Sequence, residues 1–368
     1  MNNQRYKICL VSISLAGGGA ERSCAMLSEM LHQLGHKVHI AILNDDIDYP
    51  FAGELFNLGI YKKNNDSLWQ RFGRLKRFRR FLVDNSFDVI IDHRTKNNYL
   101  KELFYDRYIY KDLKRIYVVH SSNRSLYLTE RPERFVKIYN RNCQNVAVSN
   151  YIQKEILEKE GVKNCITIYN TYDDKWENEI TDLPSTLQNK TYILSYGRIV
   201  DSVKDFSFLI RSFNRSKVWE QGNYLVIMGD GDDKELLKDI ASKLPCSNHI
   251  QFLPFTATPF SHIAKAHFVT LTSRYEGFPM VLVESLSLGT PVVSLDIVSG
   301  PSEIIEHKEN GLLVEKRDVS LFSDAIKTMC FNNSLYTRCK ENAEPSVKKY
   351  SREVISNKWN KLLMNELQ

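Results

Sequence analysis

The sequence predicts an α/β protein with two parallel sheets, and two observations carry that prediction. Short runs of β-branched and aromatic residues alternate with amphipathic helical stretches along nearly the whole chain, which is typical of βα units. The chain has 368 residues, too many for one ordinary hydrophobic core, so we expect about two domains. Hydrophobic residues make up 43% and charged residues 26%, a composition that excludes disordered, collagen-like and coiled-coil proteins.

The strand-like runs fall into two sets, separated by a polar stretch. In the first half we expect strands at residues 7–13, 37–43, 89–92, 115–119, 145–148 and 166–169. In the second half we expect them at residues 192–196, 224–228, 250–253, 268–272, 292–295 and 312–314. Between the sets, residues 173–190 contain Pro184 and little periodicity, which is typical of an interdomain connection. The sequence therefore predicts domains over 1–175 and 176–345, followed by a purely helical segment over 346–368 that docks on another domain.

Several classes of protein are disfavoured by what the sequence lacks. No apolar run approaches the roughly 18 residues of a membrane-spanning helix, and the N-terminus has no apolar leader with a cleavage site. The seven cysteines are scattered without a CxxC pair, so neither a disulfide framework nor a zinc site is indicated. The net charge is only +6, and we find no nucleic-acid-binding signature. We expect a cytoplasmic protein that binds no nucleic acid.

The first expected strand ends in a glycine-rich turn, Gly17-Gly18-Gly19, before a helix-like run. Glycines at such a turn let a ligand approach the backbone, and the helix N-terminus favours an anion there. The turn lacks the GxGxxG spacing of a dinucleotide site, so binding of NAD or FAD is weakly supported. A tight turn without a ligand is the alternative.

Two cations, Arg198 and Lys204, follow the first strand of the second half. One lies at the end of that strand and the other at the start of a helix, so both could face the crevice where α/β sheets bind ligands. A diphosphate would suit them. The alternative is a pair of solvated surface charges, because basic residues are common in such loops.

Two glutamates follow the strand at 268–272: Glu276 in a strand-to-helix loop and Glu284 more than a turn into the helix. Carboxylates so placed could accept hydrogen bonds from sugar or ribose hydroxyls, while nearby backbone N–H groups hold phosphate. A glycosidase acid/base pair is the rival interpretation of two glutamates, but no second motif supports it.

Together these motifs resemble the retaining glycosyltransferases of family 4. The motifs, in chain order, are Gly17-Gly18-Gly19-Ala20-Glu21-Arg22, Gly197-Arg198 with Lys204, Met228-Gly229-Asp230-Gly231, Glu276-Gly277-Phe278-Pro279 with Glu284, and Ser299-Gly300-Pro301-Ser302-Glu303. The resemblance covers roughly residues 6 to 314. It implies the GT-B fold, with an acceptor-binding and a nucleotide-sugar-binding Rossmann-like domain, a cleft between them, and a C-terminal helix that crosses back to the N-terminal domain.

The resemblance also implies roles for individual residues. Arg198 and Lys204 would bind the donor diphosphate, Glu284 the nucleotide ribose, and Glu276 a hydroxyl of the donor sugar. Backbone groups that would line the donor are those of Gly18, Gly19, Gly229, Gly277 and Phe278. His120, after the strand at 115–119, resembles the family's histidine near the transferred sugar. Without the resemblance it would more often be a structural histidine.

We expect neither a metal nor a cofactor besides the nucleotide-sugar donor. The carboxylates of residues 230–233 cluster on a loop, but a calcium loop needs wider alternation and a bidentate Glu at its twelfth position. The resemblance implies transfer of a hexose or N-acetylhexosamine, from a UDP-sugar by preference, to a hydroxyl of a lipid-linked surface polysaccharide or oligosaccharide intermediate. The alternatives are a nucleotide-sugar epimerase of the same fold and a non-catalytic GT-B binding subunit.

The last motif is a basic stretch in which six of the ten residues from 71 to 80 are Lys or Arg. On a helix, an apolar face would lie beside these cations; it comprises Leu68, Phe72, Leu75, Phe78, Phe81 and Leu82. That pattern suits a helix at an anionic membrane surface, at the inner face of the cell membrane. The alternative is a helix that packs its apolar face on the sheet, and both can hold together.

Overall fold

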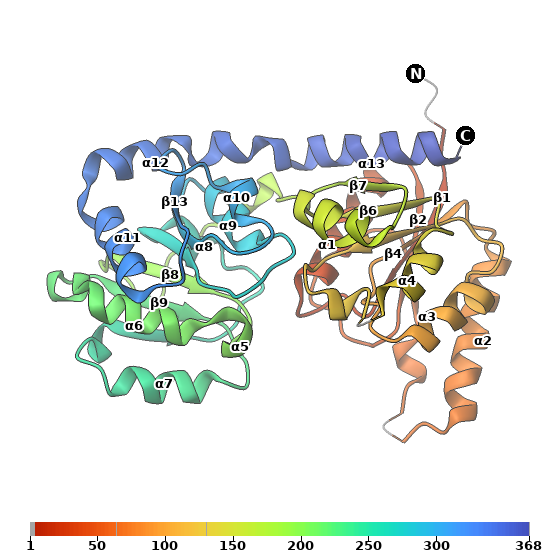
Figure 1. Cartoon of the computed structure of the whole chain (residues 1–368), viewed down its shortest axis with the longest axis horizontal. Helices are drawn as coiled ribbons and strands as arrows, with labels where there is room; N and C mark the ends of the chain where they lie inside the picture. Colours follow the sequence, from red (N-terminus) through yellow and green to blue (C-terminus); the bar gives the residue numbers. More distant parts are fainter. Residues whose placement is uncertain (1–3, 64, 130, 368) are drawn as a thin grey trace. The chain divides into compact units, whose positions relative to one another are not determined.

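Two units make up the protein, which we describe from a computed structural model. The structure describes residues 4–63, 65–129 and 131–367. One unit comprises Met1–Thr171 with Arg352–Gln368, and the other comprises Tyr172–Ser351. In each unit, strands are enclosed by helices (Figure 1). The predicted α/β class with two parallel sheets is confirmed.

The first unit contains a seven-stranded sheet in the order β3-β2-β1-β4-β5-β6-β7, with every neighbouring pair parallel. Its strands are β1 (Lys7–Ser12), β2 (Lys37–Ile42), β3 (Glu54–Asn57), β4 (Val89–Asp92), β5 (Arg115–Val119), β6 (Gln144–Ala147) and β7 (Cys165–Thr167). Its helices before the C-terminal segment are α1 (Gly19–Gln33), α2 (Leu68–Asp84), α3 (Tyr99–Phe104) and α4 (Pro132–Tyr139). Shorter helical turns lie at Gly59–Tyr61, Tyr105–Ile109, Arg124–Leu126, Ile152–Leu157 and Glu158–Glu160. The sequence did not predict β3.

The second unit contains a six-stranded parallel sheet in the order β10-β9-β8-β11-β12-β13. Its strands are β8 (Tyr192–Tyr196), β9 (Tyr224–Met228), β10 (Ile250–Leu253), β11 (Phe268–Leu271), β12 (Val292–Leu295) and β13 (Gly311–Val314). Its helices are α5 (Asp201–Lys204), α6 (Phe206–Ser216), α7 (Lys234–Ser242), α8 (Phe260–Ala264), α9 (Met280–Ser287), α10 (Pro301–Ile304), α11 (Val319–Phe331) and α12 (Asn333–Val347). Single helical turns lie at Asp174–Glu179, Val218–Gln221, Ser247–His249 and Lys348–Tyr350.

The hydrophobic runs are buried because helices cover both faces of each parallel sheet. In β1, Ile8, Leu10 and Val11 are fully buried, and in β8 Ile193 and Leu194 are too. The strand order reverses between β1 and β4 in one sheet and between β8 and β11 in the other. In such sheets ligands bind beyond the carboxyl ends of the strands at the reversal. The motifs singled out from the sequence follow β1, β8 and β11 at these ends.

The C-terminal segment is divided between the units. α12 ends at Val347, and α13 (Arg352–Leu367) begins after a short break and belongs to the first unit. Arg352 pairs with Glu29 of α1 at 2.7 Å, and Ile355, Trp359 and Leu363 are buried. The apolar face of α13 therefore packs on α1 rather than facing solvent.

The basic helix α2 buries only part of its apolar face. Phe78 and Leu82 are fully buried, as the packing alternative predicts. Leu68 and Trp69, in the first turn, are 80% and 85% exposed, and Phe72 is 44% exposed. In the part of the chain that the structure describes, no helix is long and apolar enough to cross a membrane.

Candidate active site

The structure brings Lys204 and Glu276 into contact. Lys204 ends α5 after β8, and Glu276 lies in the loop between β11 and α9. The Lys204 ammonium donates to Oε1 of Glu276 at 2.6 Å, and the Ser273 hydroxyl donates to the same oxygen at 2.7 Å. The side chains are 21% and 16% exposed, so the pair remains accessible to a ligand. Arg198, in the connection between β8 and α5, is exposed.

The second glutamate, Glu284, is buried in α9 and only 2% exposed. Buried carboxylates need hydrogen-bond donors, and the Tyr196 hydroxyl donates to Glu284 Oε2 at 2.7 Å. Tyr196 is the last residue of β8, and its hydroxyl also lies 3.3 Å from the Val281 carbonyl oxygen. Tyr196 was not predicted as a site residue from the sequence, although it stands directly before the Gly197-Arg198 motif.

The Gly229-Asp230-Gly231 loop lies directly against the loop that carries Arg198. A Cβ atom on Gly229, whose φ is +147°, would lie 2.0 Å from the Gly197 carbonyl oxygen. A Cβ on Gly231 would lie 2.2 Å from the carbonyl oxygen of Ile199. The glycines are therefore required for the close approach of two backbone segments.

Two of the three carboxylates of residues 230–233 accept hydrogen bonds from protein donors. Asp230 accepts from Lys234 at 2.7 Å and from the Phe255 amide at 2.9 Å, and Asp233 accepts from the Asp201 amide at 2.7 Å. Among the residues that the structure describes, no group of three or more His, Cys, Asp or Glu side chains could hold a metal ion.

Gly277 and Phe278 lie against a second loop. The Ser299 hydroxyl donates to the Gly277 carbonyl at 2.6 Å, and a Cβ on Gly300 would meet Pro279 Cδ at 2.2 Å. The Phe278 ring is buried and contacts the Tyr350 ring edge-on, with centroids 5.1 Å apart. The Phe278 side chain is thus part of the core, which leaves its backbone as the group that a donor could contact.

Three of the sequence-predicted residues belong to the first unit. Gly18 is the N-cap residue of α1 and, being a glycine, makes no side-chain hydrogen bond there. A Cβ atom added to Gly19 would have no neighbouring atom within 4 Å. His120 follows β5 and lies beside His93, which follows the neighbouring strand β4. His93 Nδ1 and His120 Nε2 are 3.0 Å apart, and the rings stack with centroids 5.1 Å apart. Burial lowers the pKa of both imidazoles, that of His93 to about 3.

A buried ionic cluster holds the segment on which His93 lies. The Arg94 guanidinium donates to Asp92 Oδ2 at 2.7 Å and to Glu102 Oε2 at 3.2 Å. The Lys96 ammonium donates to the Arg94 carbonyl at 2.7 Å. Burial opposes ionisation of Asp92, but Arg94 and Lys96 lower its pKa to about 2. Burial also lowers the pKa of Lys96, to about 8. Neither His93 nor this cluster was predicted from the sequence.

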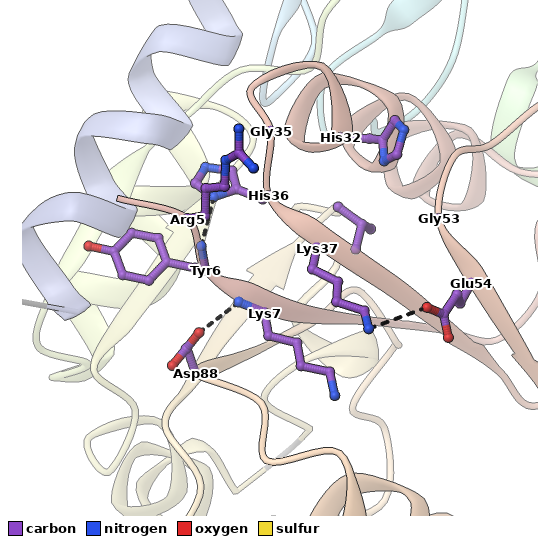
Figure 2. A pocket seen from close by; sticks show the side chains of 11 residues that line it. Arg5, Tyr6, Lys7, His32, Gly35, His36, Lys37, Gly53, Glu54 and Asp88 are labelled. Atoms are coloured by element: carbon purple, nitrogen blue, oxygen red, sulfur yellow. Dashed lines mark hydrogen bonds and ion pairs between the residues drawn. The ribbon is translucent and has the colours of Figure 1, made fainter. Parts of the chain in front are cut away.

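A hollow lies elsewhere in the first unit. It measures about 490 Å³ and lies at the amino-terminal ends of β1 and β2, opposite the edge where such sheets bind ligands. Figure 2 shows Lys37 reaching Glu54, at 3.6 Å, and Asp88 accepting the Lys7 amide, at 2.6 Å. It holds none of the residues that the resemblance implies for the donor, so we do not assign it to the donor site.

Family models match nearly the whole chain. A model described as "Glycosyltransferase Family 4" matches residues 17–176, and one described as "Glycosyl transferases group 1" matches residues 179–345. The chain therefore belongs to the family 4 glycosyltransferases and has their GT-B fold, as the resemblance implied. It is a glycosyltransferase of a retaining family.

The chain is also similar to individual glycosyltransferases. An uncharacterized glycosyltransferase of Haemophilus influenzae is 28% identical to this chain. The match covers 60% of this chain and 61% of that relative's length. The N-acetylgalactosamine-N,N'-diacetylbacillosaminyl-diphospho-undecaprenol 4-alpha-N-acetylgalactosaminyltransferase of Campylobacter jejuni is 26% identical over 95% of this chain and 97% of its own. The crystal structure of Anabaena HepE with UDP-glucose matches with a TM-score of 0.79 at 20% identity, covering 98% of this chain and 100% of HepE.

Proposed function

We propose that this protein transfers a hexose or N-acetylhexosamine from a UDP-sugar, with retention, to a hydroxyl of a lipid-linked glycan acceptor. The observation that carries the proposal is the Lys204–Glu276 contact of 2.6 Å at the carboxyl edge of β8 and β11, where a doubly wound sheet binds its ligand. The Campylobacter relative, which acts on a diphospho-undecaprenol acceptor, and HepE, which binds UDP-glucose, support the substrate classes.

In this proposal the second unit binds the donor and the first binds the acceptor. Arg198 and Lys204 contact the diphosphate, and the carboxylate of Glu284 accepts from the ribose. Glu276 accepts from a hydroxyl of the sugar. Without a donor, Lys204 and Glu276 neutralise each other. Donor binding exchanges that pair for an ion pair of Lys204 with phosphate and a hydrogen bond from a sugar hydroxyl to Glu276.

The chemistry needs charge stabilisation more than a nucleophile. As the C–O bond to the diphosphate breaks, negative charge grows on the leaving group, and preorganised cations stabilise it. Arg198, Lys204 and the backbone amides of Gly277 and Phe278 are the groups we assign to this role. The leaving phosphate accepts the proton of the incoming hydroxyl, and His120 contacts the transferred sugar. We propose that no metal is required.

We also propose that α2 brings the protein to an anionic membrane on the cytoplasmic side. The exposed Leu68 and Trp69 lie in the same helix as the exposed cations Arg71, Lys76 and Arg80. An apolar tip beside cations is the pattern of a peripheral membrane helix. Such a contact would place the protein where a lipid-linked acceptor lies.

Transfer itself is the direct test. The protein is incubated with UDP-glucose, UDP-galactose, UDP-GlcNAc or UDP-GalNAc and an undecaprenyl-diphosphate-linked oligosaccharide, and products are analysed by mass spectrometry and by NMR of the anomeric proton. Thermal shift selects the donor first, since a ligand at 100 times its dissociation constant stabilises by about 2.7 kcal/mol. A product in which the anomeric configuration is inverted would contradict the proposal.

The same assay separates the alternatives. An epimerase would convert the donor with no acceptor present, so a new nucleotide sugar in that reaction would favour it. A non-catalytic subunit would bind a partner or the glycan without forming product. The contact of Lys204 with Glu276 supports the transferase, because a binding subunit has no use for a diphosphate site.

A further inference from the structure

A buried aspartate, Asp205, directly follows Lys204 and has a left-handed backbone conformation. Its φ is 52° and its ψ is 46°, at the point where α5 ends and α6 begins. Residues other than glycine rarely adopt this conformation, although Asp and Asn tolerate it best. The Asp205 side chain is 2% exposed. A buried charge in a disfavoured conformation needs strong partners, and the structure supplies them.

Asp205 has two cationic partners: Arg274, whose guanidinium lies 2.9 Å from Asp205 Oδ2, and Arg317, in the connection between β13 and α11. Arg317 makes the wider set of contacts. Its guanidinium donates to Asp205 Oδ2 at 2.7 Å, to the Thr272 carbonyl at 2.9 Å and to the Ser273 carbonyl at 2.5 Å. A planar guanidinium can satisfy several acceptors at once, which a lysine cannot do in the same geometry. The cation also lies 5.5 Å from the centre of the Phe208 ring.

These contacts join the two segments that carry Lys204 and Glu276. Ser273 leads into the loop of Glu276, and its hydroxyl donates to the Glu276 carboxylate at 2.7 Å. The Thr272 hydroxyl lies 3.0 Å from the Lys204 carbonyl oxygen and 3.2 Å from that of Asp205. Arg317 therefore bridges the turn that follows Lys204 and the strand end that precedes Glu276.

We propose that Arg317 is a positioning residue of the donor site. By holding Asp205 against the end of β11, it directs Lys204 towards the diphosphate, which Arg317 itself does not touch. The inference rests on the proposed function, because it assumes that Lys204 binds the diphosphate. It adds a residue that the sequence motifs do not include.

Binding of UDP to the full chain tests the inference, measured by calorimetry well below the unfolding temperature. We expect Arg317→Met to weaken UDP binding roughly tenfold, which corresponds to about 1.4 kcal/mol. The double variant Arg317→Met/Lys204→Met should bind UDP no more weakly than Lys204→Met alone, because Arg317 acts through Lys204. A purely structural role would give no such coupling.

Two further variants keep the test decisive. Asp205→Gly removes the carboxylate, yet glycine adopts the left-handed conformation freely, so the turn persists and UDP binding should weaken as in Arg317→Met. Arg215→Met is the matched control, because Arg215 joins α6 to Ser320 of α11, at 3.2 Å, and should leave UDP binding unchanged.

The outcomes also separate this inference from the proposed function. Wild-type UDP affinity in folded Arg317→Met, or losses that add fully in the double variant, would overturn the positioning role alone. Wild-type UDP affinity in Lys204→Met would instead show that the diphosphate site is wrongly assigned. That result would contradict both the proposed function and the role of Arg317.

Discussion

Tyr196 donates a hydrogen bond to Glu284, with its hydroxyl 2.7 Å from a carboxylate oxygen that is buried in α9. The hydrogen bond orients the carboxylate that we assign to the donor ribose. A buried charge that loses a donor is penalised, and a hydrogen bond to a charged group contributes about 1.5–3 kcal/mol. The pair therefore joins the end of β8 to the helix that carries the ribose contact.

Tyr196→Phe should weaken donor binding about tenfold or more, because Glu284 loses an orienting donor. Tyr192→Phe is the control, since it removes a hydroxyl from the same strand that donates to the His262 carbonyl at 2.6 Å. Both variants should lose some stability, but only Tyr196→Phe should raise the KM for the donor. Equal donor KM values in the two variants would contradict the role of Tyr196.

Gly229→Ala should abolish donor binding, because its Cβ would lie 2.0 Å from the Gly197 carbonyl and displace the loop of Arg198. Gly222→Ala is the control, because it introduces backbone strain at a positive φ without a steric clash. Gly222 has a φ of +83° and nothing within 4 Å of an added Cβ, so its substitution costs only about 1–2 kcal/mol of strain. Thermal unfolding and UDP calorimetry of both variants check the prediction. Normal UDP affinity in Gly229→Ala would mean that the two loops do not need to touch.

Activity should survive excess EDTA, because we assign the charge of the leaving diphosphate to Arg198, Lys204 and backbone amides. Initial rates are compared with and without EDTA, and then after addition of Mg²⁺ or Mn²⁺. Loss of transfer in EDTA that either cation restores would contradict this assignment and direct attention to Asp230.

The strands were predictable because both faces of each sheet are covered, which makes the strand residues continuous apolar runs. β3 was missed because it lies at the sheet edge and carries only Leu55 and Phe56 as apolar residues, both partly or largely exposed. The interruption between α12 and α13 was also not expected. Boundaries of this kind depend on tertiary packing, which a single sequence does not reveal.

The site was predictable only where its residues are close in the sequence or form a known motif. His93 and His120 are 27 positions apart, and they meet because β4 and β5 are neighbours in the sheet. Periodicity does not indicate strand order, so the pair could not be predicted from the sequence. The same holds for Arg317, which reaches Asp205 from 112 positions away.

The free energy of unfolding should fall as the pH is lowered from 6.5. Burial lowers the pKa of His93 to about 3, with Asp92 opposing and Lys96 adding to the effect, and burial likewise lowers the pKa of His120. Unfolded, each imidazole has a pKa of about 6.5. Between about pH 6.5 and 3 the unfolded chain therefore binds more protons, so acid favours unfolding, by up to about 1.4 kcal/mol per pH unit for each histidine. Above pH 6.5 both states are neutral and the contribution is constant.

Urea unfolding at pH 7.5, 6.5 and 5.5 checks this dependence. His93→Gln should show a shallower fall than the wild type, because one of the imidazoles whose pKa burial lowers is gone. His32→Gln, on the exposed face of α1, should match the wild type. Identical pH slopes in His93→Gln and the wild type would show that His93 does not carry the effect.

The last prediction concerns α2 and an anionic membrane, and the structure changes which residues should be tested. Arg79 donates to the carbonyls of Ile109 and Lys111, each at 3.0 Å, and Arg77 lies 4.2 Å from the centre of the Tyr61 ring. Substituting Arg79 would disturb the packing of α2 as well as its surface charge, and substituting Arg77 would remove the contact with Tyr61. Arg71, Lys76 and Arg80 are exposed and are therefore the better probes.

The protein should sediment with vesicles of phosphatidylcholine and phosphatidylglycerol, but little with phosphatidylcholine alone, and less as salt is added. Replacing Arg71, Lys76 and Arg80 with Glu should abolish the binding, because each cation near such a surface contributes about 1 kcal/mol. The same charge change around α4, with Glu at the N-cap residue Arg131 and at Arg134 and Lys137, should have a smaller effect if the surface of α2 is specific. Trp69→Ser should weaken binding without changing its salt dependence, since it removes an apolar contact. Equal sedimentation with both vesicle types, or equal losses in the two charge variants, would exclude α2 as the membrane contact.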